Sequence, residues 1–325
     1  MSATNSCVDM APSYRLIDYR IRPSKHVERI MLAEAFRRQR FHAIEDYQYV
    51  GLGSVFFTDF RVLHKALGIT QMFSIEKQEV HRDRFEWNKP YSGINILFGH
   101  TEKRLSDIDF SIPTIIWLDY DGSLDKSVIS DIRAVSRSAS HGAILVVTVN
   151  AHPRQPNDDG ADMLEQVSAE LGNERISADT DLTTLRGWGL ADFYRRVGTN
   201  EIEDSLSNAN GVRDPELKIE YEQIFNFRYE DGARMATFGG VFFQKDRRAE
   251  FEACAFERLN YIRNGIDSFR INAPKLTLRE IAYLERQLPL EDPDQLDWGA
   301  MPENDAKQYM ELYRYLPTYL PVDFL

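Results

Sequence analysis

The stretch from residue 46 to residue 76 constrains this chain most, because it has the pattern of a strand, a glycine turn, an amphipathic helix and a second strand. Residues 47–50 have the pattern of a buried strand, residues 56–67 that of the helix, and residues 71–75 that of the second strand. Gly51 and Gly53 allow a sharp turn and a close approach of a ligand to the backbone. Glu76 closes the second strand, where a carboxylate can accept hydrogen bonds from ribose hydroxyls. We interpret the stretch as a nucleoside-binding βαβ unit.

The turn differs from the dinucleotide-binding pattern, which has a third glycine where this chain has Phe56. A pyrophosphate site is therefore disfavoured. The order Tyr49-x-Gly51-x-Gly53-Ser54, with an acid 23 residues after Gly53, is similar to the S-adenosylmethionine site of class I methyltransferases. A tight turn without a ligand is the alternative, and the flanking strand, helix and acid argue against it.

The charge balance limits the partners of the chain. Acidic residues outnumber basic ones by 51 to 39, and the net charge of −12 argues against a general polyanion binder. A local basic segment is nevertheless present between residues 14 and 40, with eight Arg or Lys against three acids. We interpret it as a solvated helix face, with a nucleic-acid contact as the alternative. Its basic residues are Arg15, Arg20, Arg22, Lys25, Arg29, Arg37, Arg38 and Arg40. Arg22 and Lys25 lie at the N-terminal edge of the predicted helix, from which they could reach a site at the cofactor end of the sheet.

The two cysteines indicate neither a disulfide framework nor a zinc site, because Cys7 lies in a polar tail and Cys254 on a predicted helix. Residues 1–12 lack the basic start and apolar core of a signal peptide, and no apolar run is long enough to span a membrane. We therefore expect a cytoplasmic protein in a reducing compartment.

Three further strands with polar ends follow the central unit. Residues 95–98 lead into Gly99-His100-Thr101, residues 114–118 into Asp119-Tyr120-Asp121-Gly122, and residues 143–149 into Asn150. Helices are predicted at 25–41 with Ser24 as N-cap, at 80–89 and at 126–140. The alternation predicts an α/β fold with five parallel strands and right-handed crossovers, whose carboxyl ends open onto one crevice.

The rest of the chain adds a hairpin and helices to this sheet. Asp231-Gly232 between two apolar runs predicts an antiparallel hairpin, which distinguishes class I methyltransferases from most dinucleotide-binding folds. Residues 154–215 are interpreted as a lid-type insertion. Residues 1–45 form a tail and covering helix, 46–246 the main domain, and 247–325 a helical extension with helices at 247–263 and 277–286. The apolar residues 309–325 are expected to dock on the domain or on a partner subunit.

Several motifs together resemble a bacterial family described as putative O-methyltransferases over about residues 15–290. These motifs are Asp18-Tyr19-Arg20-x-Arg22-Pro23-x-Lys25, Tyr49-x-Gly51-x-Gly53-Ser54, Ser74-Ile75-Glu76, Asn88-Lys89-Pro90, Trp117-Leu118-Asp119-Tyr120-Asp121-Gly122 and Val147-Thr148-Val149-Asn150-Ala151. The resemblance implies the class I fold and an S-adenosylmethionine site, but it does not identify the acceptor. Residues expected to bind the cofactor are Tyr49, Gly51, Gly53, Ser54, Glu76, Lys77, Gly99, His100, Thr101 and Asp119.

Methyl transfer to oxygen requires alignment of the reactants and removal of a proton from the acceptor. Asp119 and His100 are the candidate general bases, and Asp121 is a further catalytic candidate. A magnesium ion held by Asp119, Asp121 and Asn150 is an alternative way to lower the pKa of the acceptor. The fourth strand does not end in an Asn-Pro-Pro-aromatic sequence, which disfavours amino methylation of DNA bases.

Three hypotheses therefore remain at this point. The first is an S-adenosylmethionine-dependent O-methyltransferase with an unidentified acceptor. The second is an inactive methyltransferase fold that senses the cofactor or binds partner proteins, including a second copy, through the C-terminal segment. The third is an RNA- or DNA-modifying methyltransferase that uses the basic segment, which the acidic net charge disfavours.

Overall fold

A computed structural model describes residues 22–317, except 154–161, 178–179, 182, 184 and 291. The motif residues 18–20, Arg15 and Cys7 lie outside this range, as do residues 318–325. The chain folds around an eight-stranded sheet in the order β3-β2-β1-β4-β5-β7-β6-β8. Its strands are β1 (Gln48–Leu52), β2 (Gln71–Glu76), β3 (Ile94–Phe98), β4 (Thr114–Asp119), β5 (Ile144–Asn150), β6 (Ile219–Glu230), β7 (Arg234–Gln244) and β8 (Phe269–Ile271).

The predicted architecture of five parallel strands and a hairpin is confirmed. Strands β1 to β5 pair in parallel, and β7 pairs antiparallel with both β5 and β6. The additional strand β8 pairs in parallel with β6 through three residues. So short a strand carries no alternation that the sequence analysis could detect.

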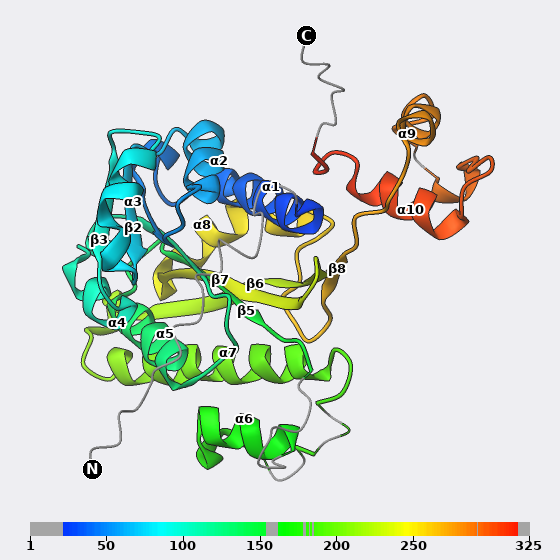
Figure 1. Cartoon of the computed structure of the whole chain (residues 1–325). Helices are drawn as coiled ribbons and strands as arrows, with labels where there is room; N and C mark the ends of the chain where they lie inside the picture. Colours follow the sequence, from blue (N-terminus) through cyan, green and yellow to red (C-terminus); the bar gives the residue numbers. More distant parts are fainter. Residues whose placement is uncertain are drawn as a thin grey trace, which may run out of the picture.

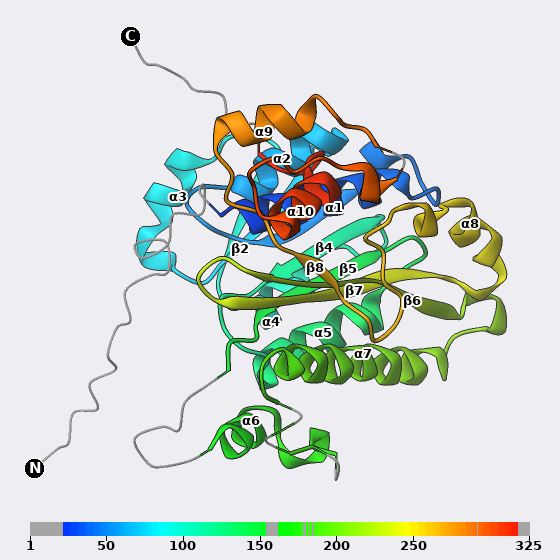
Figure 2. The same ribbon diagram turned by 90° about the vertical axis from the view of Figure 1, so that its right-hand side faces the viewer.

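Helices cover both faces of the sheet (Figures 1 and 2). One face packs against α1 (Pro23–Arg38) and α2 (Thr58–Leu67), and the other against α5 (Lys126–Ser138) and α7 (Gly189–Asn210). Successive side chains of β4 enter the two cores alternately, with Trp117 on the α1 side and Leu118 on the α5 side. This explains why the strand is apolar nearly throughout. The shorter helices are α3 (Arg82–Asn88), α4 (Thr101–Arg104), α6 (Met163–Leu171) and α8 (Arg248–Ala253).

The first helix begins earlier than predicted. Arg22, and not Ser24, is its N-cap residue, and Pro23 occupies the first position. The N–H groups of Ser24 and Lys25 are capped from far along the chain, because both donate to the Asp231 carboxylate at 3.3 and 2.9 Å. A cap from the distant β6–β7 turn leaves no local sequence signal, whereas proline at the first position is a known helix start.

Part of the predicted insertion belongs to the sheet's own covering layer. The long helix α7 packs beside α5 beneath the sheet, and α6 lies outside it (Figure 1). Buried side chains of α7, including Leu190, Tyr194 and Ile202, belong to the core on that face. This segment therefore acts as a crossover helix, and a lid role for the remainder stays a prediction.

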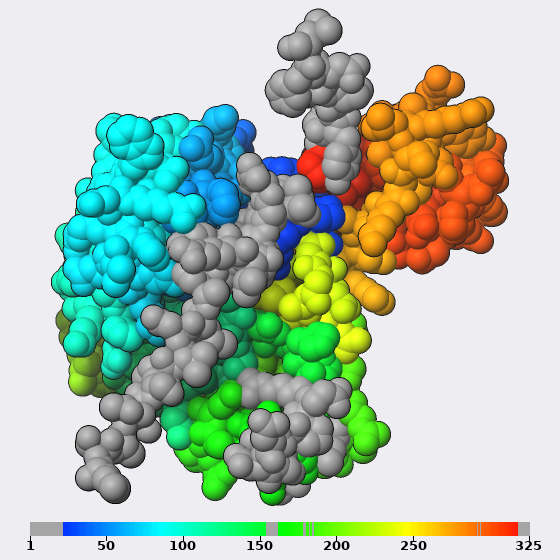
Figure 3. All heavy atoms as spheres, viewed as in Figure 1, coloured from blue at the N-terminus to red at the C-terminus, as the bar shows by residue number. Residues whose placement is uncertain are grey.

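The C-terminal extension forms a lobe at one side of the molecule (Figure 3). It contains α9 (Leu278–Glu285), which has the predicted capping box of Thr277 and Glu280, and α10 (Glu303–Leu312). The predicted helix 247–263 was too long, because α8 ends at Ala253 and Ala255 has a φ of +49°. Tyr315 is buried and its hydroxyl donates to Glu34 of α1 at 2.9 Å, so this part of the predicted segment 309–325 docks on the domain, while residues 318–325 lie outside the described range.

Shorter features complete the described chain. Single 3-10 turns lie at Ile44–Asp46, Glu79–His81, Leu105–Asp107, Asn173–Arg175, Pro215–Leu217, Lys245–Arg247, Phe256–Arg258 and Pro293–Gln295. None of the helices in the described ranges is both long and apolar enough to cross a membrane.

Candidate functional site

A cavity of about 370 Å³ lies at the carboxyl ends of β1, β2 and β4, where a doubly wound sheet places its ligands. The predicted residues that line it are Gly53, Ser54, Glu76, Lys77, His100, Thr101, Asp119 and Asp121. Residues that the prediction omitted also line it: Arg29, Leu52, Thr58, Asp59, Ile75, Gln78, Phe85, Glu102, Tyr120, Ser127 and Asp131. The predicted residues Tyr49, Gly51 and Gly99 are not among the described lining residues.

The turn after β1 brings the backbone close to β2. The N–H of Gly53 donates to the carbonyl of Ile75 at 2.6 Å. A Cβ on Gly53 would lie 2.9 Å from Ser74 Oγ and 3.0 Å from Glu76 Oε2. Glycine is therefore required here by close approach. Gly51, in contrast, lies within β1, where a Cβ would meet the Tyr49 hydroxyl at 2.5 Å.

Glu76 occupies the tip of β2, as predicted, and faces the cavity from a largely buried position. Its Oε1 accepts a hydrogen bond from the Gln78 N–H at 2.7 Å. Burial raises the pKa of this carboxyl to about 7, against which the hydrogen bond acts. The group can thus bind or release a proton near neutral pH, and its ionised form can accept hydrogen bonds from a diol.

Asp119 at the tip of β4 belongs to a buried charge cluster with Lys25 and Glu28. The Lys25 ammonium lies 2.6 Å from Asp119 Oδ1 and 2.7 Å from Glu28 Oε2, and it is 1% exposed. It also lies 4.4 Å from the centroid of the Trp117 ring, a cation–π distance. Burial raises the pKa of Asp119 to about 6, although Lys25 opposes this shift.

The cluster continues into the sheet through hydroxyl groups. Glu28 accepts a hydrogen bond from Thr237 Oγ1 of β7. Thr237 and Thr148 are joined through their hydroxyls at 2.8 Å, and Thr148 accepts from the Trp117 indole at 3.0 Å. Helix α1 is thereby fixed to β4, β5 and β7 by one polar network, and the position of Asp119 depends on all of them.

A second buried pair lies one helical turn further along α1. The guanidinium of Arg29 donates through Nε to Asp59 Oδ1, in the first turn of α2. Burial opposes ionisation of Asp59, but Arg29 and Lys25 outweigh it and lower the pKa of this carboxyl. The spacing of Lys25 and Arg29 places both cations on one face of α1. Lys25 was predicted to reach a site from the N-terminal edge of the helix, whereas Arg29 was interpreted as part of a solvated face; the four-residue spacing from Lys25 was the available sequence signal for Arg29.

The loops after β3 and β4 form the remaining part of the cavity wall. His100 is exposed at the cavity and is the N-cap residue of α4, while Thr101 begins that helix. Tyr120 donates to Asp131 Oδ2 at 2.6 Å, and burial raises the pKa of Asp131 to about 6. The loop after β3 is tied to β2, since the Gly99 N–H donates to the Glu76 carbonyl at 2.9 Å.

The described residues contain no group of three or more His, Cys, Asp or Glu arranged for a metal ion. Of the proposed magnesium ligands, Asp119 and Asp121 line the cavity, whereas Asn150 is not among its described lining residues. The Asn150 Oδ1 atom instead accepts from the His152 N–H at 2.8 Å. A magnesium ion held by these three residues therefore stays a prediction.

The chain is similar to a sequence family and, distantly, to solved structures. The family described as "Putative O-methyltransferase" matches residues 17–324. A comparison with curated sequences gives no match. Cofactor-bound Rv0187 from MTB superposes with a TM-score of 0.37 at 11% identity, over 74% of this chain and 94% of that one. For the mitomycin 7-O-methyltransferase MmcR the TM-score is 0.33 at 12% identity, over 66% of this chain and 53% of that one. The classification of the chain rests on the match to the family, and these distant structures do not contribute to it.

Proposed function

We propose that this chain, which belongs to the family described as Putative O-methyltransferase, transfers the methyl group of S-adenosylmethionine to an oxygen atom of an acceptor. Membership of the family indicates methyl transfer; that the accepting atom is an oxygen is our proposal. One observation supports the location of the site best. Glu76 and Asp119, at the tips of β2 and β4, line the same cavity beside the Gly53 turn.

The residues present fit an adenosyl group. Gly53 lets the turn after β1 pass close to β2, where the buried Ser74 Oγ has no partner among the described residues. Glu76 would accept hydrogen bonds from the ribose hydroxyls. Arg29 and Asp59 line the same cavity with opposite charges, so they would face the carboxylate and ammonium groups of the methionine part.

When bound, S-adenosylmethionine supplies a methyl group on a positively charged sulfur; the acceptor oxygen takes the methyl group, and the electron pair of the broken carbon–sulfur bond stays on sulfur. The chain must orient the acceptor and remove its proton. Asp119 would take this proton through Oδ2, because Oδ1 is held by Lys25. A carboxyl with a pKa of about 6 is mostly ionised at pH 7 and is a stronger base than an ordinary aspartate.

The test is calorimetric titration with S-adenosylmethionine and, separately, with NAD, followed by detection of S-adenosylhomocysteine after incubation with candidate acceptors. We expect S-adenosylmethionine alone to bind. Glu76→Gln should weaken binding about tenfold or more, because hydrogen bonds to a charged group are worth about 1.5–3 kcal/mol. Glu79→Gln is the matched control, since Glu79 is 66% exposed and pairs only with Arg82 among the described residues.

Binding of NAD in preference to S-adenosylmethionine, or an unchanged affinity in folded Glu76→Gln protein, would contradict the assignment of the site. Binding without transfer to any acceptor would favour a cofactor-sensing module. A nucleic-acid acceptor predicts salt-dependent binding of RNA or DNA that is lost when Arg37, Arg38 and Arg40 are changed to Ala.

A further inference from the structure

An open pocket of about 570 Å³ lies between the first turns of α7 and the residues 266–268 that lead into β8. Three arginines line it, Arg195 and Arg196 from α7 and Arg228 from β6. The pocket has no described lining residue in common with the cavity that contains Glu76 and Asp119. Its volume is in the range of sites for small organic molecules.

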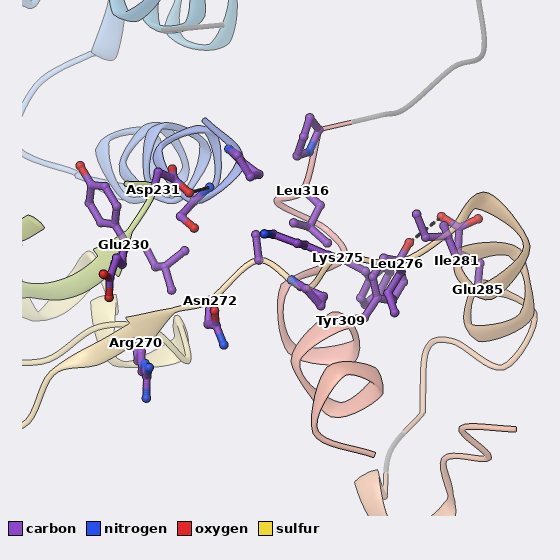
Figure 4. Close-up of a pocket in the computed structure, with 18 of the residues that line it drawn as sticks. Glu230, Asp231, Arg270, Asn272, Lys275, Leu276, Ile281, Glu285, Tyr309 and Leu316 are labelled. Carbon is purple, nitrogen blue, oxygen red and sulfur yellow. Dashed lines mark hydrogen bonds between the residues drawn. The ribbon is translucent and has the colours of Figure 1, made fainter. Parts of the chain in front are cut away.

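The alternation of side chains along β6 directs a pair of arginines to this side of the sheet. Phe227 and Tyr229 belong to the core on the α1 side, so Arg228 between them faces α7. Arg270 of β8 is the register partner of Arg228. Figure 4 shows the side chain of Arg270 directed away from Asp231 and from α1. The two arginines therefore lie side by side on one face of the sheet edge.

Neighbouring side chains hold two of the lining arginines in place. Arg195 donates through Nη1 to Gln223 Oε1 at 3.3 Å. Arg228 donates through Nη2 to the Asp192 carboxylate. The other terminal nitrogen of each guanidinium group has no partner among the described residues. A ligand would thus meet cations that are already positioned, which reduces the entropy lost on binding.

Positive charge exceeds negative charge around this pocket, although the whole chain has 51 acids and 39 bases. Burial lowers the pKa of Arg195 and of Arg228, and the neighbouring Arg196 and Arg270 lower it further. The side chain of Arg228 is 17% exposed, so water screens this repulsion only in part. The charged groups of the pocket and its edge are Arg195, Arg196, Arg228 and Arg270 against Asp192 and Asp267.

The arrangement of the cations suits a phosphate group. One guanidinium group can satisfy a carboxylate through two parallel hydrogen bonds, whereas a phosphate has further oxygen atoms for a second and a third arginine. Arg195 and Arg228 reach the pocket from different elements, as such shared binding requires. Phe193 and Ile266 add apolar surface, and Ile266 is 74% exposed. This surface favours a phosphate that is attached to an organic body.

We propose that this pocket binds the phosphate group of a phosphorylated ligand through Arg195, Arg196 and Arg228. The site goes beyond the proposed methyl transfer and does not depend on it, because the two cavities have separate described linings. A phosphorylated small molecule and the backbone of a nucleic acid both present this group, and the experiment distinguishes them.

The first probe is phenyl phosphate, with phenol as its uncharged counterpart, and ligand-observed NMR with the full chain measures both affinities at low ionic strength. We expect phenyl phosphate to bind and phenol not to bind. Arg195→Gln should weaken the binding of phenyl phosphate about tenfold, because a hydrogen bond between charged groups is lost. Arg247→Gln is the matched control, since Arg247 pairs with Glu250 at 2.5 Å and is not among the described lining residues.

A gain of affinity gives a test that misfolding cannot imitate. Asp267 is exposed, lines the pocket and has no partner among the described residues. Asp267→Asn should strengthen the binding of phenyl phosphate about threefold, because it removes a charge that repels the phosphate.

A short oligouridylate is the second probe and identifies the source of the phosphate. Binding tighter than that of phenyl phosphate, which weakens as salt is added and is lost in Arg195→Gln, would assign a nucleic acid. Binding of phenyl phosphate without tighter binding of the oligouridylate would assign a small phosphate ester.

The inference would be overturned if neither probe bound, if phenol bound as well as phenyl phosphate, if Arg195→Gln left the affinity unchanged, or if Asp267→Asn gave no gain. Titration of the same samples with S-adenosylmethionine separates the two proposals. Cofactor binding should be the same in the wild type and Arg195→Gln. A cofactor that does not bind to the wild type would contradict the proposed function alone.

Discussion

Replacing Lys25 by Met tests whether the charge cluster at α1 holds this region together. The change removes the cation that lies 2.6 Å from Asp119 and 2.7 Å from Glu28, and the side chains of Glu28 and Asp119 are 0% and 21% exposed. Breaking a buried ion pair by removing one partner costs about 3–5 kcal/mol, because the remaining charge stays desolvated. We expect a loss of this size in the free energy of unfolding at pH 8.

The pH dependence gives a sharper test than the magnitude. The pKa of Asp119 is about 6 in the folded protein and about 4 in an unfolded chain. Because the folded protein binds the Asp119 proton more tightly than the unfolded chain does, this group stabilises the fold at a pH below its unfolded-state pKa. The contribution is lost as the pH rises through the folded-state pKa. Without Lys25 the folded-state pKa of Asp119 rises further, so the loss of stability continues to a higher pH. The difference between the wild type and Lys25→Met should therefore be larger at pH 8 than at pH 5.5.

Urea unfolding at both pH values measures this difference. Lys89→Met is the matched control, because Lys89 pairs with Glu86 on the surface, where such pairs contribute about 0–1 kcal/mol. The double variant Lys25→Met/Glu28→Gln should recover part of the loss, since one unpaired carboxylate is removed. A loss below about 1 kcal/mol at pH 8, or a difference that does not change with pH, would refute the reasoning.

Three further predictions concern the turn, the β2 carboxylate and the C-terminal lobe. Gly53→Ala should weaken S-adenosylmethionine binding in calorimetry, because its Cβ would meet three oxygen atoms of β2 at 2.9–3.1 Å; Gly265→Ala, with open space around it, should not. Affinity for the cofactor should rise between pH 6 and pH 8, because Glu76, with a pKa of about 7, must be ionised to accept hydrogen bonds from both ribose hydroxyls; a profile that persists in Glu76→Gln would assign it elsewhere. Tyr315→Phe should lower the unfolding free energy by about 1–2 kcal/mol, since the hydroxyl donates to Glu34 at 2.9 Å; an unchanged value would mean that this bond does not stabilise the lobe.

Local pattern was sufficient to predict the central unit and its end groups. The glycine turn, the acid after the second strand and the carboxylates after the fourth strand follow from short sequence motifs, and Glu76 and Asp119 line one cavity. Parallel strands present their carboxyl ends at the same edge, so the sequence order of the polar ends was enough to group them. Tyr49 was predicted to bind the cofactor, but its ring packs on Phe60 inside the core, with centroids 5.1 Å apart, and it is not among the described lining residues of the cavity.

The sequence by itself determined the alternation of strands and helices, the hairpin and the polar residues at the strand ends, because these depend on local periodicity and turn chemistry. Only the tertiary structure decided the roles of Lys25 and Arg29. Both lie in a stretch whose charge suggests a solvated face, and both are buried because carboxylates from β4 and α2 meet them. It also decided the cap of α1 by Asp231, which is 206 residues from Lys25 in sequence. Pairing between distant charges depends on how the layers pack, and no local pattern encodes it.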